Sequence, residues 1–162
     1  MSKHHLALEF EDLTKDIMTD SRLHQMKNYI QHGRVTTFDH AVDVARMSFL
    51  IHKGLRLKSD PKELLRGALL HDYFLYDWHK EYIQTPEEKE SSSPLDSLHG
   101  FSHAGAAARN AKRDFETTEK EGHIIESHMW PLNITKIPRT TNAWIVCIAD
   151  KICSARETLF KR

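Results

Sequence analysis

The chain has 162 residues, 40% of them hydrophobic and 28% charged, which suits one globular domain with a core of its own. Its 23 basic residues balance 23 acidic ones, so there is no overall positive field to hold a nucleic acid polymer or an anionic membrane. No stretch is apolar for long enough to span a membrane, and the first residues lack the apolar block of a signal peptide. We therefore expect a cytoplasmic protein with a single domain, residues 1–162.

Helices are expected to dominate, because the chain has only six glycines and five prolines and few runs of alternating β-branched residues. A sheet is hard to place. Apolar residues recur at helical spacing over residues 6–31, which predicts one long or two short helices ending near Gly33. These helices would form an N-terminal packing arm, residues 1–35, on a core of residues 37–155.

The core is predicted to be a helical bundle, giving an all-α protein of about six to seven helices. Asp60, Pro61 and Glu63 are typical of a helix start, with an Asp cap and a proline at the first helical position. The polar, proline-containing segment 85–97 predicts a surface loop. The expected core helices span residues 37–57, 61–70, 102–115, 119–129 and 141–160.

The chain is rich in histidine, with 12 residues, none of them after His128. Five of them are expected at terminal, surface or boundary positions: His4, His5, His24, His32 and His52. Cys147 and Cys153 are six apart in one predicted helix, about 9 Å along its axis, which exceeds the roughly 7 Å limit for a disulfide. We expect both to be reduced core residues.

Three polar residues stand at the end of, or inside, apolar helices. His71 and Asp72 follow the apolar run 64–70, and Asp150 lies in the nearly continuous apolar stretch 144–153. A buried carboxylate requires a paired charge or a metal ion. Asp150 is therefore either a metal ligand or half of a salt bridge to an Arg or Lys of another helix.

Three further histidines, each on a different predicted helix, complete the pattern: His40, His103 and His128. Singly, each is more typical of a hydrogen-bonded histidine, but a helical bundle builds a metal site from inward ligands on several facing helices. Imidazole and carboxylate together suit Zn²⁺, Fe²⁺, Mn²⁺ or Co²⁺, whereas oxygen-only sites suit Ca²⁺ and Mg²⁺.

The order of His40, the pair His71-Asp72 and Asp150 resembles the H…HD…D signature of the HD-domain phosphohydrolase superfamily, over residues 37–155. The local sequences 38–45, 68–72 and 148–151 are similar to the family's helices as well. The resemblance implies a compact helical HD domain and a metal-dependent phosphohydrolase.

Subgroups of that superfamily that bind two metals carry two further histidines, and His103 and His128 are similar to these in order and approximate spacing. Examples are bacterial diadenosine tetraphosphate hydrolases and HD-GYP cyclic dinucleotide phosphodiesterases. HD-GYP proteins have a lysine where this chain has Leu75, and the Gly-Tyr-Pro signature is absent, so hydrolysis of cyclic di-GMP is not expected.

The resemblance implies a site for two divalent transition-metal ions (Fe, Mn, Zn, Co or Ni) and a metal-activated water. Asp72 would be a catalytic residue that bridges the two ions. The first ion would be held by His40, His71, Asp72 and Asp150, and the second by Asp72, His103 and His128. The substrate would be a small phosphorylated molecule, nucleotide-like, with a phosphomonoester, phosphodiester or phosphoanhydride bond.

Other residues have more than one interpretation. His99 could protonate the leaving group, replace His103 as a ligand, or be a solvated loop residue. Lys151 and Arg139 are the basic residues nearest in sequence to the proposed site. Each could bind a phosphate or lie on the surface. The aromatic segment 73–79 could stack on a base or belong to the core.

The main alternatives to a two-metal enzyme are a one-metal nucleotidase and a non-catalytic helical domain that binds a metal or a nucleotide. A structural zinc site would normally close with four Cys or His ligands, whereas two of the six candidates here are carboxylates. The sequence leaves open whether the protein forms a homodimer.

Overall fold

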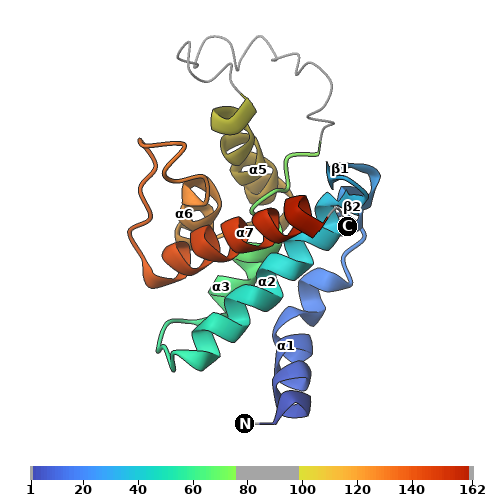
Figure 1. The fold of residues 1–162 in the computed structure, drawn as a ribbon, viewed down its shortest axis with the longest axis vertical. Helices are drawn as coiled ribbons and strands as arrows, with labels where there is room; N and C mark the ends of the chain where they lie inside the picture. The colour runs from blue at the N-terminus through green and yellow to red at the C-terminus, as the bar shows by residue number, and fades with distance from the viewer. Residues whose placement is uncertain (1, 76–98, 161–162) are drawn as a thin grey trace.

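The computed structural model describes residues 2–75 and 99–160 (Figure 1). A short antiparallel hairpin of β1 (Ile30–His32) and β2 (Val35–Thr36) is the only sheet in these ranges. All other elements are helices, so the predicted all-α class is confirmed. They are α1 (Lys3–Met18), the 3-10 helix η1 (Leu23–Asn28), α2 (Thr37–Gly54), α3 (Pro61–Leu70), α5 (His99–Phe115), α6 (Glu119–Ser127) and α7 (Thr141–Phe160).

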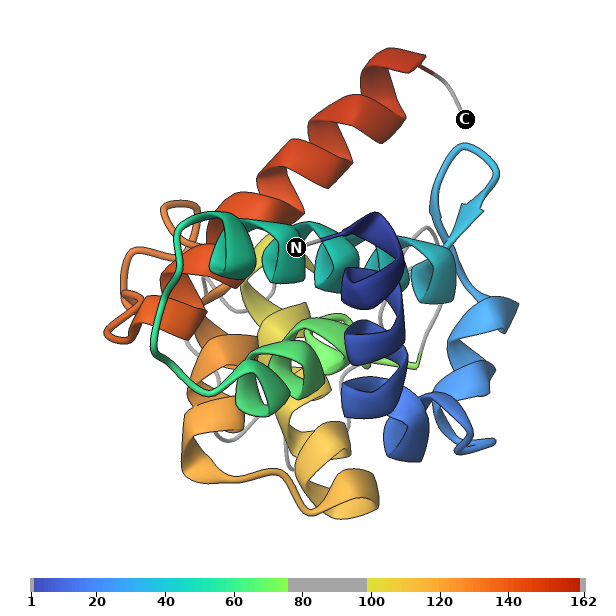
Figure 2. The same ribbon diagram turned by 90° about the horizontal axis from the view of Figure 1, so that it is seen from below.

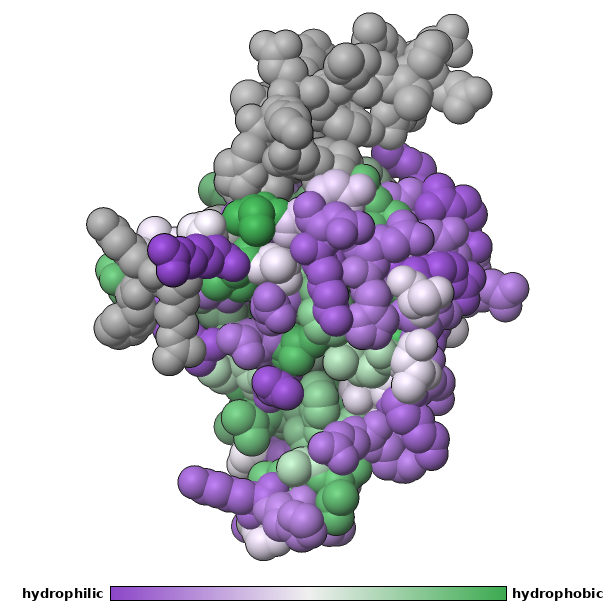
Figure 3. Space-filling view, turned by 90° about the vertical axis from the view of Figure 1, so that its right-hand side faces the viewer, coloured by the Kyte–Doolittle hydropathy of each residue, from purple (hydrophilic) through white to green (hydrophobic). Residues whose placement is uncertain are grey.

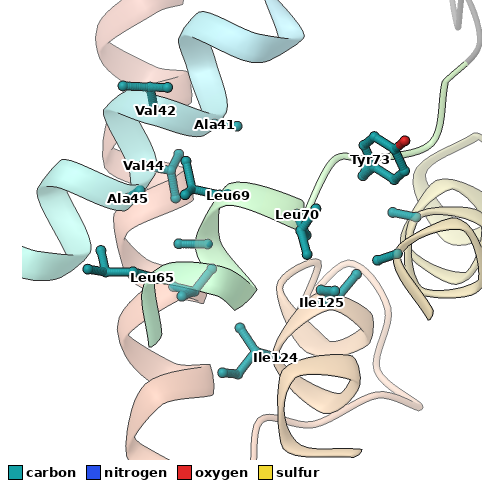
Figure 4. Packing of buried hydrophobic residues seen from close by; sticks show 14 of the residues in the cluster. Ala41, Val42, Val44, Ala45, Leu65, Leu69, Leu70, Tyr73, Ile124 and Ile125 are labelled. Atoms are coloured by element: carbon teal, nitrogen blue, oxygen red, sulfur yellow. The ribbon is translucent and has the colours of Figure 1, made fainter. Parts of the chain in front are cut away.

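Helix α3 lies at the centre of the fold, packed against α2 on one side and α6 on the other. Leu65 and Leu69 of α3 lie beside Val44 and Ala45 of α2, and Ile124 reaches the other side of α3 from α6 (Figure 4). Helix α7 packs across α2, and its C-terminal part extends beyond the other helices (Figure 2). The C-terminal ends of α3 and α6 lie close together in the core, where the ring centroids of His71 and His128 are 4.8 Å apart.

A glycine permits the close contact between α3 and α6. A Cβ atom added to Gly67 would lie 2.7 Å from Cγ2 of Ile124, which is closer than carbon atoms can pack. The hydrogen at this position lets the α6 side chain rest against the backbone of α3. The separation of the two helices thus depends on the absence of a side chain at residue 67.

The start of α3 follows its sequence signal. The side chain of Asp60 accepts hydrogen bonds from the backbone N–H groups of Lys62 and Glu63, with Pro61 as the first helical residue, as predicted. Some predicted ends were off by two or three residues: the second helix ends at 54 instead of 57, α5 begins at 99 instead of 102, and α6 ends at 127 instead of 129. The predicted bounds of α7 are those observed.

The prediction of helix up to residue 31 was wrong for its last part. After α1 the chain forms only the short 3-10 helix η1 and then enters the hairpin, in which Gly33 has a left-handed φ of 58°. Met26 and Ile30 have helical spacing, but Met26 is fully buried and Ile30 is 41% exposed, so they do not share one buried stripe. β-branched residues flank the turn, which favours a strand pair.

The predicted surface or boundary position of His52 is wrong. His52 is 3% exposed, and its Nε2 lies 2.9 Å from the carbonyl oxygen of Ser59, so it is a core residue instead of a surface or boundary one. Cys147 and Cys153 are free and buried, as expected. His4 and His5 are exposed and His24 is half-buried, also as expected, whereas the side chain of His32 and the predicted loop 85–97 lie outside what the structure describes.

Apolar surface is exposed in the lower half of the face in Figure 3, where α1 lies. A groove between α1 and α2 is lined there by apolar side chains that include Leu6, Phe10, Phe49 and Leu50. None of its lining residues belongs to the predicted metal site. Within the described ranges, no helix is both long and apolar enough to span a bilayer.

Candidate metal centre

The six predicted ligands converge in the core from five places in the chain. Helix α2 supplies His40, the residues after α3 supply His71 and Asp72, α5 supplies His103, the residue after α6 is His128, and α7 supplies Asp150. All six are at most 8% exposed. Four imidazoles and two carboxylates thus share a space shielded from solvent.

One group of ligands surrounds Oδ2 of Asp72. This oxygen lies 3.3 Å from Nε2 of His71 and 3.8 Å from Nε2 of His40. Oδ1 of Asp150 closes the group, at 3.2 Å from Nε2 of His40 and 3.9 Å from Nε2 of His71. Nε2 of His40 and Nε2 of His71 therefore each lie within 4 Å of one oxygen of Asp72 and one oxygen of Asp150.

A second group surrounds the other oxygen of the same carboxylate. Oδ1 of Asp72 lies 3.5 Å from Nε2 of His128 and 3.6 Å from Nε2 of His103, and these two nitrogens are 3.2 Å apart. The ligand atoms of Asp72, His103 and His128 all lie within 4.8 Å of one another, as do those of His40, His71 and Asp72. Asp72 thus faces a different histidine pair with each oxygen.

The ends of α3 and α6 orient two of the imidazoles in the same way. Nδ1 of His71 lies 2.7 Å from the carbonyl oxygen of Ala68, and Nδ1 of His128 lies 2.6 Å from that of Ile125. The last carbonyls of a helix have no partner within the helix, so an N–H at Nδ1 satisfies one of them. The lone pair then sits on Nε2, which is the atom that points into the site.

His40 is oriented by a residue that the sequence analysis missed. Glu157 of α7 accepts from Nδ1 of His40 with both carboxylate oxygens, at 2.9 and 3.1 Å. Glu157 follows Asp150 by two helical turns, so the helical period could have placed both on one face of α7. Gln31 was also missed: its Nε2 donates to Oδ2 of Asp72 at 2.7 Å from the unpredicted hairpin.

The charges in the site favour ionised carboxylates. Burial alone would raise the pKa of Asp72, but the neighbouring histidines, His71 first, hold it well below its usual range. Burial likewise opposes ionisation of Asp150 and is the largest single influence, but the hydrogen bond from His40 and the charges of the neighbouring histidines together lower the pKa of Asp150. Two negative charges are therefore fixed inside the core.

His128 and His40 differ in their state of protonation. Burial lowers the pKa of His128 to about 3, so this ring is neutral and able to act as a ligand at physiological pH. Burial also opposes protonation of His40, yet its hydrogen bonds to Asp150 and Glu157 raise the pKa to about 10. Without a metal ion, a proton on His40 supplies the positive charge that the carboxylates require.

The donor set fits a transition metal. Nε2 of His71 and Oδ1 of Asp72 are buried and make no hydrogen bond with a described residue, although a buried polar atom without a partner is costly. Asp150 has no Arg or Lys of another helix within ion-pair distance in the described ranges; its charged neighbours are His40, His71 and Lys151. The salt-bridge alternative for Asp150 therefore finds no support there.

The remaining candidates lie at or beyond the edge of the site. Nζ of Lys151 donates to the carbonyl oxygen of His128 at 2.8 Å and lies 3.8 Å from Oδ2 of Asp150. Arg139 is exposed, and its backbone N–H donates to Nε2 of His123 at 2.9 Å. His99 is the first residue of α5, but its side chain lies outside what the structure describes.

The aromatic segment 73–79 is described only in part. Tyr73 and Phe74 are core residues, 0% and 3% exposed. Residues 76–79 are outside the described ranges. The core interpretation therefore holds for the first two aromatic residues.

Comparison with known families decides the classification. The family model described as HD domain matches residues 37–155, which is most of the chain. The chain belongs to the HD domain family. This assignment places it in the superfamily of metal-dependent phosphohydrolases, and His71-Asp72 is the pair that resembles the HD signature. Neither the curated proteins nor the solved structures gave a match to this HD domain.

Proposed function

We propose that this HD domain hydrolyses a small phosphorylated molecule, nucleotide-like, with two divalent transition-metal ions. The observation that carries the proposal is the placement of Asp72, whose two oxygens face two different pairs of histidines. A one-metal site needs only His40, His71, Asp72 and Asp150. It would leave unexplained why two more imidazoles direct their Nε2 atoms at the second oxygen.

In this proposal each group of side chains holds one ion. His40, His71 and Asp72 hold the first together with Asp150, which contacts both of these histidines, and Asp72, His103 and His128 hold the second. When bound, two such cations neutralise charge on the phosphate and lower the pKa of the attacking water. Asp72 keeps the two positions close together, and the buried surroundings strengthen every charge interaction in the site.

Substrate would approach where the site is least covered. Asp150 and His103 are the most exposed of the six ligands, at 8% and 7%. The side chain of Lys151 is 40% exposed beside Asp150, so its ammonium group can bind a phosphate oxygen at this edge. Arg139 is the poorer candidate for this role, because Asp150 lies about 14 Å along α7 from that helix's first residue.

His99 is retained as the proposed general acid. It precedes His103 by four residues in α5, so both lie on one side of that helix. A histidine there can donate a proton to a leaving group near neutral pH. The proposal takes residues 1–162 as one domain, with the metal centre in the core of residues 37–155.

The test uses protein stripped of metal and reloaded separately with Mn²⁺, Fe²⁺, Co²⁺, Ni²⁺ or Zn²⁺. Each sample is assayed with a nucleoside monophosphate, a linear dinucleotide and a dinucleoside polyphosphate. We expect metal-dependent release of product from at least one substrate class. The Lys151→Met variant should raise KM more than it lowers kcat, because Lys151 binds substrate in this proposal and holds no metal.

Two outcomes would replace the proposal. Full activity with a single ion per chain would favour a one-metal nucleotidase. Binding of metal and nucleotide without turnover in any class would favour a non-catalytic binding domain.

A further inference from the structure

Glu157 is a buried acid that no ligand role explains. It is 4% exposed on α7, and burial of an unpaired carboxylate costs several kcal/mol. The neighbouring Arg156 does not neutralise it, because that guanidinium donates to Asp43 at 2.8 Å. Within the described ranges, the ion-pair partner of Glu157 is His40, held at 2.9 Å.

The contact fixes which nitrogen of His40 can bind a metal. Both oxygens of Glu157 face Nδ1, so Nδ1 carries a proton and donates it. Nε2 then points at Oδ1 of Asp150, 3.2 Å away, and at Oδ2 of Asp72, 3.8 Å away. Glu157 itself contacts the ring at Nδ1, on the side away from Asp72 and Asp150.

His40 differs in this respect from two other histidines of the site. His71 and His128 each place Nδ1 against a neutral backbone carbonyl, whereas His40 places it against a carboxylate. An anionic acceptor pulls the proton from Nδ1 and makes Nε2 a stronger electron-pair donor. The imidazole of His40 is thereby strengthened as a ligand for one ion of the pair.

We infer that Glu157 is a positioning residue that orients His40 and strengthens its bond to the first metal ion, without touching that ion or the substrate. The inference rests on the proposed function, since it requires a metal at His40. It predicts that loss of the carboxylate weakens one of two metal positions selectively. The position formed by Asp72, His103 and His128 should be unaffected.

The experiment compares Glu157→Gln with Glu121→Gln. Glu121 is an equally buried glutamate, also 4% exposed. Its carboxylate pairs with the guanidinium of Arg66, 2.7 Å away, and neither residue is a predicted ligand. Zn²⁺ affinity is measured by competition with a chromophoric chelator. Glu157→Gln should weaken one of two Zn²⁺ sites by about 10–100-fold relative to the other, whereas Glu121→Gln, which loses a contact between α3 and α6, should not weaken one site selectively.

A second readout follows the hydrogen bond itself. In the Zn²⁺-loaded, ¹⁵N-labelled protein, the Nδ1–H proton of His40 should resonate far downfield and move upfield in Glu157→Gln. Unchanged affinity and an unchanged resonance in that variant would overturn the inference, as would the same selective loss of one site in Glu121→Gln. Failure of the wild-type protein to bind Zn²⁺ would overturn the proposed function and the inference together.

Discussion

The imidazole rings of His71 and His128 lie edge to face, with centroids 4.8 Å apart and planes at 82°. Their Nε2 atoms face opposite oxygens of Asp72, at 3.3 and 3.5 Å. Each ring is held by the carbonyl three residues earlier, at the end of its own helix. The spacing of the two proposed metal positions is therefore set by how closely α3 and α6 pack.

Gly67 provides a direct test of this packing. In Gly67→Ala the new Cβ meets the side chain of Ile124 at 2.7 Å, so either Ile124 or the two helices must shift. We expect a loss of about 1–3 kcal/mol in the free energy of unfolding, measured by urea titration, together with weaker metal binding. The control is Gly122→Ala on α6, where a Cβ meets nothing within 4 Å. That variant should gain up to about 1 kcal/mol, and a similar loss in both variants would contradict the packing account.

Asp72→Asn tests the bridging carboxylate with almost no change in size. Because both groups of ligands share Asp72, this variant should lose metal from both positions, with affinities falling by more than the roughly 100-fold known for residues outside the ligand shell. Asp43→Asn is the matched control, since Asp43 lies one turn after His40 but pairs with Arg156. Calorimetric titration with Mn²⁺ measures both. Wild-type affinity at either position in Asp72→Asn would exclude the bridge.

The lowered pKa of His128 predicts how the metal-free protein responds to acid. Unfolded chains take up a proton on this histidine near its usual pKa of 6.5, whereas the folded protein does so only near 3. The contribution of His128 to the free energy of unfolding is therefore fully present above about pH 6.5. It is lost progressively as the pH falls from 6.5 toward 3.

The comparison is between wild type and His128→Gln in the presence of a chelator. The difference in unfolding free energy between them should change by up to about 1.4 kcal/mol per pH unit across this range. Chemical denaturation at several pH values measures it. Parallel pH profiles for the two proteins would show that His128 does not titrate abnormally.

The sequence predicted the helices and ligands whose signals are local. Asp60 and Pro61 mark a helix start by capping chemistry alone, and His71-Asp72 stands out because two polar residues end an apolar helix. The hairpin was not predictable in the same way. Its strands have two or three residues, too few for a period of two to show, and Met26 and Ile30 imitate helical spacing.

The residues behind the ligands were also missed, for a different reason. Gln31 and Glu157 act through contacts with residues that are distant in the chain, and neither belongs to a motif. Only the seven-residue spacing of Glu157 from Asp150 gave a signal, and a glutamate is much more often exposed than buried. Likewise, His52 was expected near the surface because its partner, the carbonyl of Ser59, can be identified only from the folded chain.

The metal content per chain, measured by mass spectrometry, tests most directly whether the site holds two ions. Wild-type protein loaded with Mn²⁺ should carry about two ions, and His103→Ala and His128→Ala should each carry about one, with sharply reduced turnover. His40→Ala and Asp150→Ala should also lose one ion, from the other position. A single ion in the wild type, kept together with the wild-type rate in His103→Ala and His128→Ala, would contradict the two-metal account.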